Sequence, residues 1–408
     1  MKIYKGNKSG ICPVCQTASS SVLKYSTRKL YHYAIGELSY KLIPYRVLRC
    51  LNPECSRKTF THYEEKDRID LCGRSIYSKS TQQFAAQKML KHSISYNSFK
   101  AQIEDDFQVK TAVSTLYTWA KKVKILESKS APTDFKEITV LNTDEKHPFK
   151  KKKSANNKFL IMSAGKSQTE RSATPLHLNT ASSNDGMALK VHYNELITKG
   201  LQPQSIRLVV TDLLPAYGSV IAELFPNALH QFCVFHLMQL IHKIFKQALK
   251  THRYDHFKEG SRKEAHKTAL CMMRGHEKLN PEEREKVADF CEAHPNVMAD
   301  YALKEEIRGL YAGSKNEIQA RAWKDIIVEN YETKISATME KALKCLTDHF
   351  EKTISYLKVG ILHAKTNNDA ERIMRKIQYN QKVHCYFRKE ESLLRHLKIR
   401  LGITQIAA

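Results

Sequence analysis

The stretch SIRLVVTDLLPAYGSVIAELFPNALHQFCVFHL, residues 205–237, decides the fold class of this chain. It begins with a run of β-branched and leucine residues, turns through Pro215, and continues as a helix and a second apolar segment. Three short apolar runs, EITVLNTD, KFLIMSAG and ATPLHLNT, and an amphipathic segment that ends at Gly200 precede it. Three strands, a helix, a strand, a helix and a strand predict an α/β fold, with a mixed sheet covered by helices over residues 134–240.

Two of the predicted strands end on an aspartate. Asp144 ends EITVLNTD, and Asp212 ends SIRLVVTD. Ligand groups gather at the carboxyl ends of strands in an α/β sheet, so the two carboxylates converge if their strands are neighbours. The local alternative is that each Thr-Asp pair is only the exit of a strand. Glu145 should point to the opposite face from Asp144 if its strand continues, which makes it a poor ligand candidate.

A third carboxylate, Glu371, lies in TNNDAERIMRK, on a predicted helix that Thr366 and Asp369 can cap. The local alternative for Glu371 is a surface ion pair with Arg375, one turn later, which would contribute only about 0.2–0.5 kcal/mol. Three acidic residues at the ends of buried elements, in a chain of formal charge +25, instead suggest a cage for divalent cations on a protein that attracts polyanions.

The composition points to DNA as the polyanion. Among 408 residues, 67 are Lys or Arg and 42 are Asp or Glu, and the excess is spread along the chain. A hydrophobic content of 42% is enough to bury the cores of several domains, which excludes a disordered basic tail. No signal-peptide pattern begins the chain, and no apolar run reaches the roughly 18 residues of a membrane span. We therefore expect a cytoplasmic, nucleoid-associated protein with no membrane partner.

Cysteine spacing organises residues 1–65. CPVC supplies Cys12 and Cys15, and CLNPEC supplies Cys50 and Cys55. Two short-range thiol pairs separated by a strand-forming segment are typical of a zinc ribbon that holds one structural ion, although the second pair is more widely spaced than usual. A redox Cys-x-x-Cys motif is the alternative, but it would leave the second pair unexplained and would need a βαβ pattern that is absent here.

Residues 75–126 change to a helical pattern. The segment VKTAVSTLYTWAKKVK carries an apolar stripe, with small polar residues at its start and lysines at its end. A short helix, a turn and such a second helix suit a helix-turn-helix domain, whose second helix enters the major groove of DNA. Any three-helix bundle could show the same pattern. The residues expected to contact DNA from this helix are Ser114, Thr115, Thr118, Lys121 and Lys122.

Residues 241–357 show no strand signals and predict an all-helical block. Helix starts of the cap-plus-proline and capping-box kinds occur in it, at Asn280 and Ser314. The last segment, residues 358–408, would return to the α/β domain and carries Glu371. The helical block is therefore predicted to interrupt the domain that holds the three carboxylates.

The pattern TDxxPAYxxxIxxxFPxAxHQxCxFH, together with the distal TNNxAER, resembles the catalytic core of the DDE transposases of bacterial insertion sequences. The resemblance spans roughly residues 138–402. It implies an RNase H-like mixed sheet interrupted by a helical insertion and preceded by a zinc ribbon and a helix-turn-helix domain. It also implies that Asp144, Asp212 and Glu371 are a catalytic triad that binds two Mg²⁺ or Mn²⁺ ions.

The resemblance extends to residues beside the triad. Cys233 and His236, in CVFH, are similar to the C/D-x2-H motif of Mutator-like transposases and would support the site. Without that likeness, His236 would be a hydrogen-bonded core histidine and Cys233 a structural residue. Arg375 would contact DNA, but Gln378 stands where related enzymes place a basic residue.

A DDE transposase would cut double-stranded DNA at the ends of its element and join them to a target by two-metal phosphoryl transfer. Because two ends must be brought together, the resemblance implies a homodimer or larger assembly on DNA. The alternatives are a non-catalytic DNA-binding protein derived from a transposase, and a metal-dependent nuclease. Short inverted repeats flanking the coding region would favour the active transposase over the non-catalytic protein.

Overall fold

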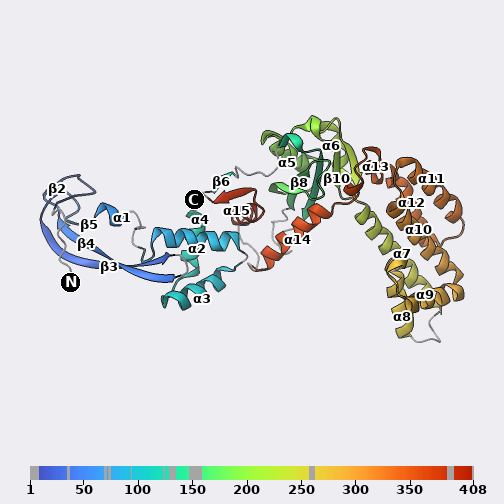
Figure 1. Cartoon of the computed structure of the whole chain (residues 1–408), viewed down its shortest axis with the longest axis horizontal. Coiled ribbons are helices and arrows are strands. Elements are labelled where there is room, and N and C mark those ends of the chain that lie inside the picture. The colour runs from blue at the N-terminus through green and yellow to red at the C-terminus, as the bar shows by residue number, and fades with distance from the viewer. Residues whose placement is uncertain are drawn as a thin grey trace. The chain divides into compact units, whose positions relative to one another are not determined.

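The computed structural model describes residues 9–34, 37–68, 71, 75–92, 94–122, 125–127, 135–146, 159–256, 262–383 and 390–406. The chain forms two compact units (Figure 1). One comprises Met1–Ser128 with Asn380–Ala408, and the other comprises Lys129–Tyr379. In the part that is described, no helix is long and apolar enough to cross a membrane.

The larger unit is built around a five-stranded mixed sheet. Its strands are β7 (Val140–Lys146), β8 (Phe159–Lys166), β9 (Thr174–Ala181), β10 (Leu208–Thr211) and β11 (Leu229–Phe232). Their order across the sheet is β11-β10-β7-β8-β9. β7, β8 and β9 are antiparallel neighbours, whereas β10 and β11 run parallel to β7. The predicted mixed sheet is therefore confirmed.

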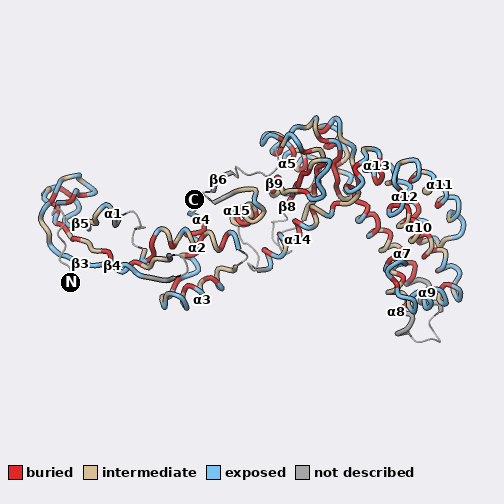
Figure 2. Tube along the Cα trace, in the orientation of Figure 1, coloured by how far each residue is buried: buried red, intermediate tan, exposed pale blue. Residues whose placement is uncertain are grey.

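Helices cover both faces of this sheet. They are α5 (Gly186–Thr198), α6 (Ala216–Leu224), α7 (Val234–His256) and α14 (Asn368–Val383). Leu141 and Val209 share a core with α5 and α6, whereas Val140 and Val210 share a core with α7. Adjacent residues of one strand enter opposite cores because side chains alternate along it. Figure 2 shows buried residues along these strands.

Between β11 and α14, every described element is helical. After α7 come α8 (Arg262–Met272), α9 (Pro281–Ala293), α10 (Pro295–Gly313), α11 (Glu317–Tyr331), α12 (Ala337–Thr353) and α13 (Ser355–Lys358). One buried core runs from Val140 and Val210 of the sheet into these helices, as far as Leu310 and Leu346. The sheet and the helical region are therefore packed as one body, and the predicted boundary between residues 240 and 241 falls inside α7.

The two predicted helix starts had different outcomes. Asn280 caps α9 ahead of Pro281, as predicted, and it also forms a capping box with Glu283. The prediction at Ser314 was wrong, because the N-cap of α11 is Asn316, whose side chain accepts a hydrogen bond from the Gln319 N–H. Ser314 is instead the C-cap of α10. Asn is at least as good an N-cap as Ser, so the later residue takes that position.

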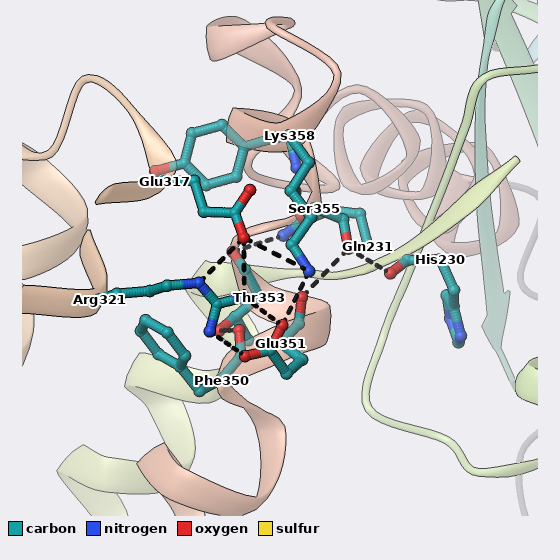
Figure 3. A network of polar contacts seen from close by, with 10 residues as sticks. His230, Gln231, Glu317, Arg321, Phe350, Glu351, Thr353, Ser355 and Lys358 are labelled. Carbon is teal, nitrogen blue, oxygen red and sulfur yellow. Dashed lines mark hydrogen bonds and ion pairs between the residues drawn. The ribbon is translucent and has the colours of Figure 1, made fainter. Parts of the chain in front are cut away.

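Polar contacts fix the helical region to the edge strand β11 (Figure 3). The buried Gln231 side chain donates to the Thr353 carbonyl at 3.0 Å and accepts from the Tyr356 N–H at 2.9 Å. Beside it, Arg321 of α11 binds Glu351 of α12 with nitrogen–oxygen distances of 2.6 and 2.8 Å. Losing a Gln231 bond would leave a buried polar group unpaired, so this residue constrains the junction more than the exposed ion pair does.

The smaller unit contains a long β-ribbon and a set of helices. Its elements are β1 (Gly10–Ile11), β2 (Ala18–Ser19), β3 (Val22–Ala34), β4 (Glu37–Arg49), β5 (Thr59–His62), α1 (Glu65–Arg68), α2 (Lys79–Lys91), α3 (Tyr96–Phe107), α4 (Val113–Lys122), β6 (Ile125–Glu127), α15 (Glu390–Arg400) and β12 (Thr404–Ile406). β6 and β12 pair antiparallel, and they join the two segments of this unit. Residues 380–408 thus group with the N-terminal segment, whereas the sequence assigned all of 358–408 to the α/β domain.

Candidate active site and cysteine cluster

The parallel register of β7 and β10 brings two aspartates to the same edge of the sheet. Val210 pairs with Asn142, and two residues further along the chain come Asp212, directly after β10, and Asp144, within β7. Neighbouring strands lie about 4.8 Å apart, so the two carboxylates emerge side by side. The convergence predicted from the strand ends therefore fits this register.

The third carboxylate, Glu371, is near enough to Asp144 to affect its pKa. Burial, followed by repulsion from Asp212 and then from Glu371, raises the pKa of Asp144 to about 7. The Leu214 N–H donates to Asp212 Oδ1 at 3.0 Å and holds that side chain at the end of β10. Like charges held this close favour either protonation or a bound cation.

Glu145 lies on the opposite face of β7 from Asp144. The strand continues to Lys146, and the Tyr217 hydroxyl of α6 donates to the Glu145 carboxylate. Burial, followed by repulsion from Asp212, raises the pKa of Glu145 to about 8. Its hydrogen bond to a buried tyrosine makes Glu145 a packing partner of α6.

Glu371 lies in the first turn of α14, and its side chain is only 18% exposed. Its Oε1 atom is buried and has no hydrogen-bond partner among the described residues. Arg375 approaches the other oxygen, Oε2, at 3.8 Å, but the Arg375 side chain is 75% exposed. So exposed and distant an ion pair stabilises the helix little, and it leaves Oε1 unsatisfied. Glu371 is therefore suited to hold a ligand.

Asn367, just before α14, connects the helix to β7. It is fully buried. Its Nδ2 donates to the Thr143 carbonyl at 2.8 Å, its Oδ1 accepts from Asn142 at 3.1 Å, and its carbonyl accepts the Glu371 N–H at 3.0 Å. Through its side chain and its carbonyl, Asn367 thus links the strand before Asp144 to the helical turn that carries Glu371. Sequence reasoning missed this residue, although TNN was visible as part of the motif.

A buried ion pair forms a second anchor for α14. Lys166 of β8 is 1% exposed, and its Nζ lies 2.7 Å from Asp369 Oδ2. Arg372 contacts the other oxygen of the same carboxylate at 3.1 Å. Asp369 therefore binds the sheet, whereas the sequence assigned it to a capping box with Thr366. Removing Lys166 would leave a carboxylate with little solvent access, which is strongly destabilising.

Cys233 and His236 lie at the start of α7, facing Glu371. The Cys233 N–H donates to the Thr211 carbonyl at 2.8 Å, and its Sγ accepts the Asn367 N–H at 3.2 Å. The Nε2 atom of His236 lies 3.8 Å from Glu371 Oε1. Burial raises the pKa of the Cys233 thiol to about 11. Both residues therefore line the carboxylate site at its helical side.

We expect the Asn367→Ala variant to lose about 2–4 kcal/mol of the unfolding free energy of the larger unit, because at least two buried polar partners become unpaired. The measurement is urea unfolding of the full chain in a Trp119→Phe background, so that the one remaining tryptophan, Trp323, reports on this unit. Asn194→Ala, at an exposed position of α5, is the matched control and should change little. Equal midpoints for the two variants would show that Asn367 does not secure α14.

The four N-terminal cysteines come together in the smaller unit. Their Sγ atoms all lie within 4.8 Å of one another, with 3.9 Å between Cys12 and Cys55 and 3.4 Å between Cys15 and Cys50. A tetrahedral zinc ion with bonds of about 2.3 Å places its sulfur ligands about 3.8 Å apart. Hydrogen bonds with Thr17 lower the pKa of Cys15 to about 6, which favours its thiolate form, whereas burial raises the pKa of Cys50 to about 12. The cluster therefore fits one zinc ion.

The residues predicted to contact DNA lie mainly on one side of α4. Leu116 and Trp119 are buried, and the Trp119 ring packs edge-on against Tyr77 at 5.0 Å. Thr118 is exposed, but its hydroxyl donates to the Ser114 carbonyl at 2.8 Å. The exposed positions are Ser114, Thr118, Lys121 and Lys122, and Thr115 is half-buried. This surface is polar and basic, as a contact with a phosphate backbone requires.

Comparison with known proteins gives one family match. The model of the ISL3-type DDE family, described as a transposase, matches residues 148–392, a span that includes Asp212 and Glu371 and begins just after Asp144. Among solved structures, the Drosophila P element transposase strand transfer complex is similar at 13% identity, over 78% of this chain and 91% of that one. Its TM-score is 0.41, too low to support an argument about the fold. No curated protein sequence matches.

Proposed function

Since the chain belongs to the ISL3 family of transposases, enzymes that cleave and transfer DNA strands, we propose that Asp144, Asp212 and Glu371 form its DDE catalytic triad. The observation that carries this proposal is that Asp144 and Asp212 come at the ends of neighbouring parallel strands, with Glu371 near enough to raise the pKa of Asp144. The sheet would be an RNase H-like core. Its order, in which three antiparallel strands adjoin two parallel ones, supports that assignment. The helices between β11 and α14 would be its insertion.

The triad would hold two Mg²⁺ or Mn²⁺ ions. Asp144, Asp212 and Glu371 would be the residues that hold them. Bound as a pair, such ions activate the attacking oxygen and stabilise the leaving oxygen of an in-line displacement. The unpartnered Oε1 of Glu371 and the raised pKa of Asp144 support the fit, because both disfavour the carboxylates without a cation.

The remaining residues of the site would hold the triad in place. Asn367 sets the distance between β7 and the first turn of α14 through its hydrogen bonds. Cys233 and His236 would support Glu371 from α7, and Arg375, exposed one turn beyond it, would contact the DNA backbone. Rigid elements on all sides are what two-metal chemistry requires, since ligands displaced by about 1 Å lose much of their effect.

Cleavage and joining of labelled DNA tests this function. The substrate is a duplex from the sequence that flanks the coding region, incubated with the full chain and Mg²⁺. Cleavage at the element end and transfer of that end to a second duplex are expected. Cleavage without joining would instead favour a nuclease, and binding without either would favour a non-catalytic DNA-binding protein. A homodimer or larger assembly on DNA is proposed, since two ends must meet.

The N-terminal unit would recognise the element end. Cys12, Cys15, Cys50 and Cys55 would hold a structural zinc ion, and α4 would enter the major groove as part of a helix-turn-helix domain. Its exposed hydroxyl and lysine positions support this placement.

We expect the Lys121→Ala/Lys122→Ala double variant to bind all DNA sequences more weakly and to flatten the slope of log K against log salt by about 1–2, because two phosphate contacts are lost. The measurement is fluorescence anisotropy over a range of salt concentrations, with an element-end duplex and a random duplex. The Lys341→Ala/Lys344→Ala variant, with exposed lysines on α12, is the control for net charge. The same slope in both variants would exclude α4 as a phosphate-contacting helix.

A further inference from the structure

Three side chains with metal-ligating atoms converge at the starts of two helices. Cys233 immediately precedes α7, His236 lies in its first turn, and Glu371 lies in the first turn of α14. One ligand atom from each residue, a sulfur, a ring nitrogen and a carboxylate oxygen, lies within 4.8 Å of the other two. In the described part of the chain, only the four N-terminal cysteines form another such group.

The cluster contains a buried acceptor with no hydrogen bond from the described part of the chain. Glu371 Oε1 is buried and has no hydrogen-bond partner among the described residues, and neither has His236 Nδ1. The separation of 3.8 Å between His236 Nε2 and Glu371 Oε1 is too long for a hydrogen bond. Burying an unpaired carboxylate oxygen is unfavourable, so a cation held by these three side chains would supply the missing partner.

The donor set identifies the class of cation. A thiolate and an imidazole prefer Zn²⁺ to Mg²⁺, which takes oxygen ligands. Around a tetrahedral zinc ion, such ligand atoms lie about 3.3–3.6 Å apart, so no pair would have to approach by more than about 1.5 Å to close the site. The His236 and Glu371 side chains are 28% and 18% exposed, which leaves an approach for the ion and for a water ligand.

We propose that Cys233, His236 and Glu371 form a Zn²⁺ site completed by water, and that zinc bound there withholds Glu371 from Mg²⁺. The first half of this proposal stands on the cluster alone. The second half rests on the proposed catalytic role of Glu371. Its consequence is reversible inhibition of DNA cleavage by zinc, relieved when zinc is chelated.

Equilibrium dialysis of the full chain against Zn²⁺ with excess Mg²⁺ tests the site without any need for activity. The wild type should bind one more zinc ion per chain than Cys233→Ser and His236→Ala. Cys345→Ser, which alters a half-buried cysteine of α12, is the control and should match the wild type. Cys233 is buried, so its replacement could disturb folding. His236 is partly exposed, so the His236→Ala variant tests the same site with less risk to the fold. Equal zinc content in all four proteins would overturn the site.

Cleavage assays with and without added Zn²⁺ test the second half, each protein being compared with its own zinc-free rate. The wild type and Cys345→Ser should be inhibited, and His236→Ala should be inhibited much less. If zinc binds at the cluster but does not inhibit cleavage, zinc does not withhold Glu371 from Mg²⁺. That result would overturn the second half of the proposal and leave the zinc site itself standing. Failure of the proposed triad is separately visible as full activity of Glu371→Gln in Mg²⁺ alone.

Discussion

Replacing Asp144 or Asp212 with Asn, or Glu371 with Gln, is expected to reduce cleavage and strand transfer on the order of 10³-fold or more, with DNA affinity near that of the wild type. Each change removes the charge of a metal ligand at nearly constant volume, and a cage missing one ligand gains little from the other two. The measurement is single-turnover cleavage of an end-labelled element duplex in Mg²⁺, with binding followed in parallel. Double variants should be barely worse than single ones.

Glu145→Gln is the matched control for the triad. It changes an adjacent carboxyl on the same strand, but on the face that contacts Tyr217, so substantial activity should remain. A single triad variant that cleaves at the wild-type rate would remove that residue from the site. If Glu145→Gln lost as much cleavage activity as Asp144→Asn, both carboxylates of the strand would take part in the reaction.

The second large effect is expected at the cysteine cluster. The core of the ribbon consists mainly of Cys12, Leu48, Cys50, Cys55 and Phe60, so most of its buried side chains are the proposed ligands themselves. Zinc in such sites contributes about 10–16 kcal/mol of apparent binding energy, which becomes folding energy. Cys12→Ser should therefore lose its tightly held zinc ion and the folded state of this segment.

Metal analysis after dialysis against a weak chelator, with limited proteolysis of the full chain, measures this effect. New cleavage sites should appear within residues 9–62 of Cys12→Ser, while Cys345→Ser keeps the wild-type pattern. The unfolding transition of the larger unit should be unaffected, because the core of that unit is separate. A Cys12→Ser protein that is as resistant to protease as the wild type would reject a structural ion at this cluster.

Features that depend on short-range spacing were predictable from the sequence. The thiol pairs, the strand that ends at Asp212 and the cap at Asn280 each follow from a few neighbouring residues. The choice of Asn316 over Ser314 shows the limit, because two good capping residues compete and the local pattern does not rank them. Residues 380–408 show a second limit of sequence-based prediction. The pairing of β6 with β12 joins segments that no local pattern connects.

The contacts around Glu371 lay beyond sequence reasoning. Asn367 matters because it contacts both β7 and α14, and Lys166 matters because it reaches Asp369 from another strand. Asn367 is far in sequence from β7, and Lys166 is far in sequence from Asp369. In a chain this basic, the sequence also does not distinguish a buried lysine from an exposed one. The family resemblance singled out Glu371, whereas periodicity alone would have made it half of a surface ion pair with Arg375.

The crowding of carboxylates at the end of β7 also sets a thermodynamic limit on the protein. The pKa of Asp144 is raised to about 7 in the folded state, whereas its ordinary value is 3.8. In the cation-free protein, the unfolded chain releases this proton first, so folding becomes less favourable as pH rises between those two values. The fold therefore retains a locally unstable arrangement that a neutral side chain would relieve. Stability and the proposed catalytic role of Asp144 would therefore pull this position in opposite directions, as happens wherever selection keeps a charge in a place that packing alone would make neutral.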